Sequence, residues 1–215
     1  MPEAPRLVLA TRNPGKLREL KPLIRAAGFV PVTLSELGLG ESVEEDRLEA
    51  FATFAENAVA KAEYFFDRCG GHPVLAEDSG LCVTALGGAP GVHSKRWGEG
   101  TGLSGSALDR HNVDRVLAAV LDAPDRSARY ACVAAMVWTG GRVTGQGETS
   151  GRLLEARCGT SGFGYDPVFW SHELARCFGA VLPEEKAQVS HRSRAVRAVL
   201  AQYGAAADPD LISAS

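Results

Sequence analysis

Short apolar runs and segments of helical periodicity follow one another along the first part of the chain. Residues 7–10 form an apolar run that is long enough for a buried strand. Asn13 follows as a favourable helix N-cap, and Pro14 suits a first helical position. The apolar positions after it predict a helix over 14–27, which Gly28 ends. The chain therefore begins with a strand that leads directly into a helix.

The most pronounced helical pattern covers residues 48–68. Within it the polar residues Glu49, Thr53, Asn57 and Lys61 recur at every fourth position, so the pattern predicts one polar stripe along the helix. Such a stripe is typical of a solvated face. Because Thr and Asn are mediocre helix formers and apolar residues flank the stripe on both sides, a wall of a cleft is slightly favoured here.

The rest of the chain predicts an α/β protein with a mixed sheet. Glycine and proline residues separate the predicted elements, and the sequence contains neither an internal repeat nor a long linker. We expect one domain over residues 1–203 and a flexible tail over 204–215. Further strands are predicted at 29–33, 73–76, 81–86, 129–139, 142–148 and 150–156, further helices at 106–121 and 190–203, a loop at 158–169 and a polar turn at 183–188.

Composition narrows the class of protein. The chain has 215 residues and a formal net charge of −3, which argues against a protein that coats nucleic acid. No apolar run approaches the roughly 20 residues of a membrane span. Since no signal-peptide pattern is visible, we expect a cytoplasmic protein. Five cysteines without a C-x-x-C spacing favour thiols in a reducing compartment over disulfides or a zinc site.

Two short segments carry candidate phosphate and metal chemistry. Thr11, Asn13 and Lys16 stand where a strand meets a helix N-terminus, which is a favourable place for an anion. Glu77 and Asp78 follow the apolar run at 73–76, in a predicted turn, and Mg²⁺ prefers a few carboxylates together with substrate phosphates. The simpler alternatives are an ordinary N-cap with a surface lysine and an ordinary Asp-Ser-Gly turn.

Two later segments could hold a nucleotide. The loop at 162–167 places Phe163 between glycines and ends in an acid, so a flat ring could stack there while Asp166 accepts from its edge. An irregular loop with a buried Phe is the alternative. Lys186, His191 and Arg192 are cations near the start of the last helix, where they oppose the helix dipole unless an anion is bound. A solvated basic helix end is the alternative there.

These segments together resemble one known family. The segments ATRNPGKLREL (10–20), TFAENAVAKA (53–62), AEDSGLCVTALGGAPGVHSKRW (76–97), GFGYDPVF (162–169) and EEKAQVSHR (184–192) are similar to the inosine triphosphate pyrophosphatase family. The resemblance covers about residues 6–203. Five motifs in the same order make it specific, whereas each motif alone would not be.

The resemblance implies roles for individual residues. Asp78 would be the proton acceptor and an Mg²⁺ ligand, Glu49 matches a family acid near the metal, and Glu77 is a further candidate ligand beside Asp78. Ala50 and Phe51 stand directly after Glu49, where the family usually has Thr-Gly. The substrate would be bound by Thr11, Arg12, Asn13, Pro14, Gly15, Lys16, Lys61, Ser79, Phe163, Gly164, Tyr165, Asp166, Lys186, His191 and Arg192.

The resemblance also implies a fold and an activity. The expected fold is a long curved mixed β-sheet flanked by helices, in two lobes with a central substrate cleft, and the expected assembly is a homodimer. The expected activity is Mg²⁺-dependent hydrolysis of ITP, dITP and XTP to the monophosphate and pyrophosphate, with no nucleic-acid or membrane partner. Two alternatives are a nucleotide sensor that has lost hydrolysis and an RNA-binding module that uses the basic residues.

Overall fold

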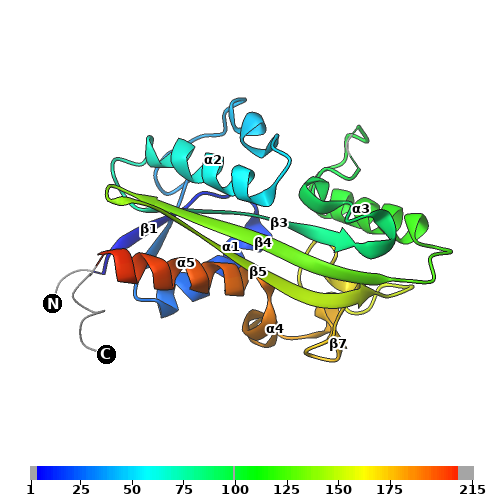
Figure 1. The fold of residues 1–215 in the computed structure, drawn as a ribbon. Helices are drawn as coiled ribbons and strands as arrows, with labels where there is room; N and C mark the ends of the chain where they lie inside the picture. The colour runs from blue at the N-terminus through cyan, green and yellow to red at the C-terminus, as the bar shows by residue number, and fades with distance from the viewer. Residues whose placement is uncertain (1–3, 99, 208–215) are drawn as a thin grey trace. The chain divides into compact units, whose positions relative to one another are not determined.

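The computed structural model describes residues 4–98 and 100–207, which form two compact units (Figure 1). Unit 1 combines Met1–Asp78, Cys132–Gly147 and Arg192–Ser215. Unit 2 combines Ser79–Ala131 and Glu148–His191. Three long strands begin in one unit and end in the other, so each unit is assembled from segments that are distant in the sequence.

The strands form a mixed seven-stranded sheet in the order β2-β1-β3-β4-β5-β6-β7. The first two pairings, β1 with β2 and β1 with β3, are parallel, whereas β5, β6 and β7 pair antiparallel. This confirms the α/β class and the mixed sheet. The strands are β1 (Arg6–Leu9), β2 (Val30–Thr33), β3 (Val74–Val83), β4 (Ser127–Trp138), β5 (Gly141–Leu153), β6 (Phe169–Ser171) and β7 (Arg176–Cys177).

Helices pack against the sheet, and in unit 1 they lie on both of its faces (Figure 1). The helix α1 begins after the predicted Asn13 cap, and Gly28 follows its end with a positive φ of 85°. The α-helices are α1 (Pro14–Ala26), α2 (Phe54–Phe66), α3 (Gly105–Ala119), α4 (Pro183–Val189) and α5 (His191–Ala207).

Strand alternation separates the core of unit 1 into two layers. Leu7 and Leu9 of β1 pack with Leu75 of β3 against α1 and α5. Val8 of β1 packs with Ala76 of β3 against α2 instead. Successive side chains of a strand point to opposite faces, so in the unit 1 part of β3, residues 74–78, odd-numbered residues face α1 and α5 while even-numbered residues face α2.

A separate apolar core supports unit 2. It combines the second half of β3, the first part of β4 and one face of α3 with the segment around β6. Tyr130, Phe169 and Phe178 form its aromatic centre, with ring centroids 4.7–6.1 Å apart. This packing supports the segment that carries Tyr165 and Asp166, both of which are buried.

The predicted turn at 77–80 was wrong, because these residues lie inside the continuous strand β3. Gly80 explains the difference. A Cβ atom at this position would lie 2.1 Å from the carbonyl oxygen of Gly91 and 2.5 Å from Oγ of Ser94. The glycine therefore permits close approach of a neighbouring segment and does not provide a turn.

The single helix predicted over 48–68 was also wrong. A 3₁₀ turn spans Glu45–Glu49, and α2 begins only after Thr53, whose hydroxyl accepts from the amide of Glu56 at 3.2 Å. Asn57 stabilises the break, since its Oδ1 accepts from the amide of Phe51 at 3.0 Å. The continuous polar stripe therefore does not exist as a helix face.

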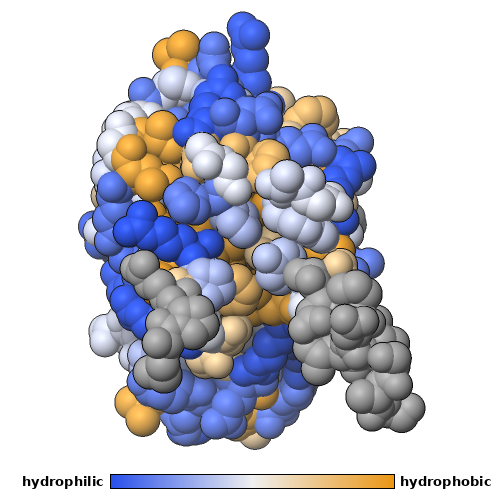
Figure 2. Space-filling model, turned by 90° about the vertical axis from the view of Figure 1, so that its left-hand side faces the viewer, coloured by the Kyte–Doolittle hydropathy of each residue, from blue (hydrophilic) through white to orange (hydrophobic). Residues whose placement is uncertain are grey.

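Smaller differences lie in the second half of the chain. The two strands predicted between residues 142 and 156 are the single strand β5, and the polar turn predicted at 183–188 is the helix α4. The helix α5 continues to Ala207, into the predicted tail, whose residues 208–215 lie outside the described part. No helix within the described part is long and apolar enough to cross a membrane. Figure 2 shows hydrophobic residues in small areas among hydrophilic ones.

Candidate functional site

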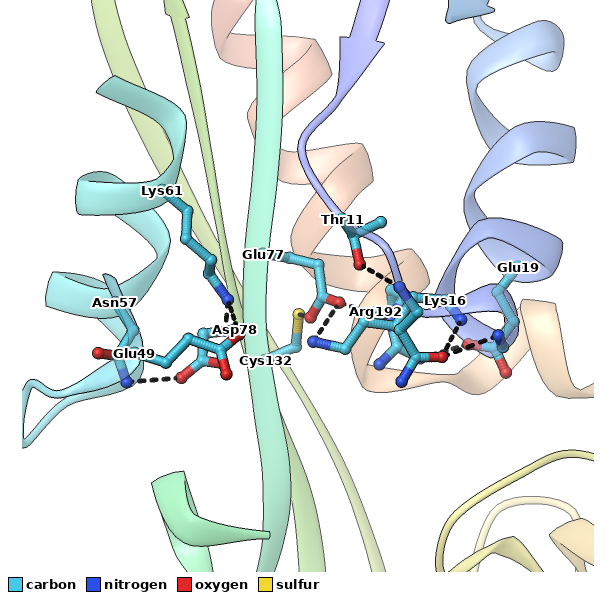
Figure 3. Close-up of polar contacts among 12 residues, drawn as sticks. Thr11, Lys16, Glu19, Glu49, Asn57, Lys61, Glu77, Asp78, Cys132 and Arg192 are labelled. Atoms are coloured by element: carbon cyan, nitrogen blue, oxygen red, sulfur yellow. Dashed lines mark hydrogen bonds and ion pairs between the residues drawn. The ribbon is translucent and has the colours of Figure 1, made fainter. Parts of the chain in front are cut away.

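Glu77 and Asp78 are neighbours in β3 whose side chains point to opposite faces of the sheet (Figure 3). Asp78 faces α2, and Glu77 faces α1 and α5, as the alternation of a strand requires. The two carboxylates therefore do not form the adjacent, repelling pair that a turn would create. Each has its own set of partners within unit 1.

The Asp78 cluster consists of Asp78, Asn57, Lys61 and Glu49 (Figure 3). The Nδ2 atom of Asn57 donates to Oδ2 of Asp78 at 2.9 Å, and Nζ of Lys61 donates to Oδ1 at 3.3 Å. The same Nζ lies 2.9 Å from Oε1 of Glu49. Two carboxylates thus meet at one ammonium group, and Glu49 keeps 31% of its side chain exposed.

The charge of Lys61 is maintained by these neighbours. Burial alone would lower the pKa of Lys61, but the negative charges of Asp78, Glu49 and Glu77 outweigh that effect and raise it. The ammonium group therefore stays protonated at neutral pH. A buried permanent cation is in place beside Asp78, where it can offset the charge of a phosphate.

The Glu77 cluster consists of Glu77, Lys16, Arg192, Glu19 and Cys132 (Figure 3). Oε1 of Glu77 lies 2.8 Å from Nζ of Lys16 and 3.3 Å from Nε of Arg192. Cys132 donates from Sγ to Oε2 at 3.4 Å, and Arg192 also pairs with Glu19 of α1. Only 1% of the Glu77 side chain is exposed, so this carboxylate is sealed from solvent, whereas 14% of the Lys16 side chain is exposed.

The pKa of Glu77 reflects its cationic surroundings. Burial raises it, but the charges of Arg192, Lys16 and Lys61 outweigh burial and hold the pKa well below its usual value. The pKa of the Cys132 thiol is raised well above its usual value by burial and by the charge of Glu77. Glu77 is therefore an anion and Cys132 a neutral thiol at neutral pH.

The turn from Thr11 to Lys16 is held by its own hydrogen bonds. Oδ1 of Asn13 accepts from the amides of Gly15 at 2.8 Å and Lys16 at 3.2 Å, and Oγ1 of Thr11 accepts from the amide of Asn13 at 3.2 Å. Pro14 has no amide hydrogen. The N-cap prediction is confirmed, but these amides are engaged within the turn, so the partly buried Lys16 side chain is the donor that the turn offers to an anion.

Arg12 stabilises a neighbouring segment. Its guanidinium forms a two-pronged contact with Glu45, at 2.8 Å for each prong, and donates to the carbonyl oxygens of Leu39 and Gly40. A cavity of about 220 Å³ lies beside it, with Thr11 among its lining residues. The substrate-binding role expected for Arg12 stays a prediction, and the structure gives this side chain a tethering role.

Unit 2 contains a third buried carboxylate–lysine pair. Oδ2 of Asp166 lies 2.6 Å from Nζ of Lys186 and accepts from the amide of Phe163 at 2.8 Å. Tyr130 donates to Oδ1 at 3.3 Å, and the ring of His191 stacks on Tyr130 at 4.5 Å with a 5° interplanar angle. The structure thus brings Lys186 and the Phe163 amide of the predicted base-binding residues onto the carboxylate of Asp166, and Tyr130 links this carboxylate to His191.

The remaining predicted residues are placed as follows. Gly164 donates from its amide to Asp109 at 3.2 Å, and Tyr165 donates from its hydroxyl to the carbonyl of Ser94 at 2.8 Å. Ser79 follows Asp78 in β3 and belongs to unit 2. Lys186, in α4, and His191 have partners in unit 2, whereas Arg192 is in unit 1 on Glu19 and Glu77. His191 and Arg192 thus begin α5 as predicted, but the three side chains have separate sets of partners and do not form one basic group.

Three contributors escaped the sequence patterns. Glu19 lies one helical turn from Lys16, so this spacing could have identified it as a partner of the basic residues. Cys132 and Tyr130 lie in a predicted central strand and belong to no motif, and no local signal marks them. Among residues 4–98 and 100–207, no group of three or more His, Cys, Asp or Glu side chains is arranged to hold a metal ion.

The fold and these clusters define an α/β protein with carboxylate–lysine pairs in the middle of β3 and at Asp166. Its sequence matches the model of the Ham1 family over residues 7–202, and the chain belongs to that family. It is 42% identical to a Thermus thermophilus protein named dITP/XTP pyrophosphatase, over 92% of this chain and 91% of that protein. This confirms the family resemblance of the motifs.

Solved structures agree with this assignment. The Ham1 protein of Staphylococcus aureus matches with a TM-score of 0.77 and 31% identity, over 93% of this chain and 98% of that one. The HAM1 protein of Coxiella burnetii matches with a TM-score of 0.77 and 32% identity over the same shares. The expected fold class is therefore confirmed by homologous structures.

Proposed function

We propose that this chain hydrolyses the non-standard purine nucleotides ITP, dITP and XTP to the monophosphate and pyrophosphate. The name of the Thermus relative, dITP/XTP pyrophosphatase, supports the reaction class and the substrates. The observation that carries the proposal is the Asp78 cluster, in which a buried carboxylate is held by two donors and a second carboxylate shares one of them.

Asp78 accepts the proton of the water that attacks the α-phosphorus. Its carboxylate is well oriented for this role, because Asn57 and Lys61 bond to its two oxygens separately. Lys61 and Lys16 supply fixed positive charge against the negative charge that develops on the phosphates. The chain thus provides both the base and the electrostatic stabilisation.

The Asp78 cluster also fits Mg²⁺. Oxygens of Glu49 and Asp78 already converge on one cation, the ammonium of Lys61, and Mg²⁺ is commonly held by one or two carboxylates together with substrate phosphates. When bound, the ion supplies charge neutralisation and a lower pKa for a coordinated water. Glu77 fits this role poorly, since its carboxylate lies on the other face with Lys16 and Arg192.

Selection of the base is proposed for the Asp166 region of unit 2. Nζ of Lys186 lies on Asp166 and 5.2 Å from the ring centroid of Phe163, on which a purine could stack. An ammonium donor can bond to a 6-oxo oxygen but meets another donor at the 6-amino group of adenine. A buried donor without a partner costs about 1–3 kcal/mol, so ITP and XTP are favoured over ATP.

Product analysis tests the reaction. Phosphorus NMR after incubation with ITP and Mg²⁺ should show pyrophosphate as the first product, and omission of Mg²⁺ with a chelator should abolish turnover. Orthophosphate as the first product would mean γ-phosphate cleavage and would refute the mechanism. Values of kcat/KM for ITP, XTP, GTP and ATP test base selection, and equal values for ITP and ATP would make a general triphosphate pyrophosphatase the better description.

Two further expectations belong to the same proposal. The family resemblance supports a homodimer, and the composition supports a cytoplasmic location. Light scattering coupled to size-exclusion chromatography measures the assembly, with a mass of twice the 22.7 kDa of one chain expected. A monomeric mass at micromolar concentration would contradict the dimer without affecting the proposed reaction.

A further inference from the structure

Glu77 holds two cations from different helices. Its Oε1 lies 2.8 Å from Nζ of Lys16, in the first turn of α1, and 3.3 Å from Nε of Arg192, in the first turn of α5. Cys132 donates to the other oxygen, Oε2. Both oxygens of the carboxylate therefore lie against neighbouring polar groups, Oε1 in ion pairs, and the side chain connects β3 with the starts of two helices.

Exposure separates the roles of Glu77 and Lys16. Only 1% of the Glu77 side chain is exposed, whereas 14% of the Lys16 side chain is. A phosphate oxygen can therefore reach Lys16 while Glu77 stays behind it. Lysine has a long flexible stem, so an ammonium group needs a fixed partner if it is to stand at one place when substrate arrives.

We propose that Glu77 is a positioning residue that fixes the ammonium of Lys16 for the triphosphate, and that it binds neither metal nor substrate. This inference rests on the proposed function. Glu77 acts through Lys16, because Lys16 is the member of the Glu77 cluster that joins the sealed carboxylate to the surface turn at Thr11–Lys16. Preorganisation of this kind lowers the reorganisation needed in the transition state.

The proposal predicts opposite effects on turnover and binding. In Glu77→Gln the ammonium of Lys16 loses its anchor, so kcat for ITP should fall at least tenfold. The local potential becomes more positive because a negative charge is removed, so KM should stay unchanged or decrease. A residue that only maintained the fold would lower the amount of active protein without this split, and a metal ligand would raise the Mg²⁺ concentration needed for half-maximal rate.

A double-mutant cycle tests whether Glu77 acts through Lys16. Glu77→Gln, Lys16→Met and the double variant are compared with the unchanged protein in kcat for ITP. We expect Glu77→Gln to cost at least tenfold in the unchanged background and less than threefold in the Lys16→Met background. Equal factors in both backgrounds would overturn the proposal, as would a tenfold shift in the Mg²⁺ requirement of Glu77→Gln.

Calorimetric binding of a non-hydrolysable ITP analogue without Mg²⁺ supplies a readout that does not need turnover. The affinity of Glu77→Gln should equal or exceed that of the unchanged protein, and Lys16→Met should bind at least tenfold more weakly in either background. Weaker binding by Glu77→Gln would overturn the proposal. Absence of pyrophosphate release by the unchanged protein would refute the proposed function, and the affinity of Glu77→Gln would still show whether Glu77 itself contacts the ligand.

Two variants control for folding. Glu63→Gln makes the same change at an exposed carboxylate of α2 that pairs with Arg142, and it should leave kcat, KM and thermal unfolding unchanged. Glu77→Asp keeps the charge on a shorter arm and replaces Glu77→Gln in both cycles if the latter does not fold. It should lower kcat in the unchanged background and not in the Lys16→Met background, and an equal loss in both would overturn the proposal.

Discussion

The two faces of β3 carry the same kind of residue in opposite settings. The Asp78 cluster has two carboxylates for one lysine, and Glu49 extends it to solvent. The Glu77 cluster balances two carboxylates against two cations, and its Glu77 and Arg192 side chains are 1% and 3% exposed. The first face places two carboxylates on one lysine and is accessible at Glu49, which suits metal and water chemistry. On the second face the Glu77 carboxylate is sealed and only Lys16 and Glu19 are partly exposed, which suits a scaffold.

This difference follows from the offset of one residue between Glu77 and Asp78 in β3. Neighbouring strand residues point to opposite faces, so a one-residue shift would exchange the surroundings of the two carboxylates. Burial of an ion pair is a weak source of stability, because desolvation offsets most of the attraction. The sealed Glu77 carboxylate is therefore better explained by the placement of Lys16 than by a gain in folding free energy.

Asp78→Asn should have the largest effect and would break the reactive face alone. The amide keeps the volume but cannot accept the proton, and general-base catalysis contributes about 10²–10⁴-fold. We expect kcat for ITP to fall at least about 100-fold, with thermal unfolding showing a folded protein. A variant that keeps more than about a tenth of the activity, a loss below roughly 1.4 kcal/mol, would mean that Asp78 is not the base.

Glu49→Gln should have the next largest effect. It tests the difference between the two faces of β3 through the Mg²⁺ requirement. Removing one of the two carboxylates that meet at Lys61 weakens the proposed Mg²⁺ site, since Mg²⁺ prefers charged oxygen ligands. The Mg²⁺ concentration for half-maximal rate should rise about tenfold. The matched variant on the other face, Glu77→Gln, should not change it. An unchanged Mg²⁺ requirement in Glu49→Gln would remove Glu49 from the metal site.

Asn57→Ala should have an intermediate effect, which acts both on the stability of the fold and on the orientation of Asp78. Asn57 is fully buried, donates to Asp78 and accepts from the amide of Phe51 ahead of α2. Loss of these bonds should cost about 1–3 kcal/mol of unfolding free energy. For a chain of this length that is a decrease in Tm of about 2–4 °C per kcal/mol. An unchanged Tm with normal kcat would show that Asn57 is not needed to orient Asp78.

Local sequence patterns predicted those parts of the site whose structure depends only on neighbouring residues. The strand at β1, the Asn13 cap and the start of α1 depend on neighbouring residues, and all three were confirmed. The turn at 77–80 was wrong because Asp, Ser and Gly favour turns, whereas Gly80 is needed for the approach of Gly91. Close packing of a distant segment outweighed the local preference.

Pairings between distant segments could not be predicted from the sequence. Nothing near Glu77 indicates that Arg192 will pair with it, and nothing near Asp166 indicates Tyr130. The break before α2 was missed because the apolar period continues through it, while Asn57 bonds back to Phe51. The family motifs selected these residues as one set, and the sheet geometry divides them between the two faces of β3 and the Asp166 region.

Cys132→Ala should have the smallest effect, and it tests whether the sealed face depends on this thiol. A thiol is a weak donor, and the contact from Sγ to Oε2 of Glu77 is long at 3.4 Å. The charges of Lys16 and Arg192 remain, so Glu77 should stay an anion in the same place. The small cavity left behind should cost about 1 kcal/mol of unfolding free energy. We expect kcat and KM for ITP to stay within about threefold of the unchanged protein. A tenfold loss of kcat, with Tm nearly unchanged, would show that the thiol itself orients Glu77 and that Lys16 and Arg192 alone are insufficient to hold it.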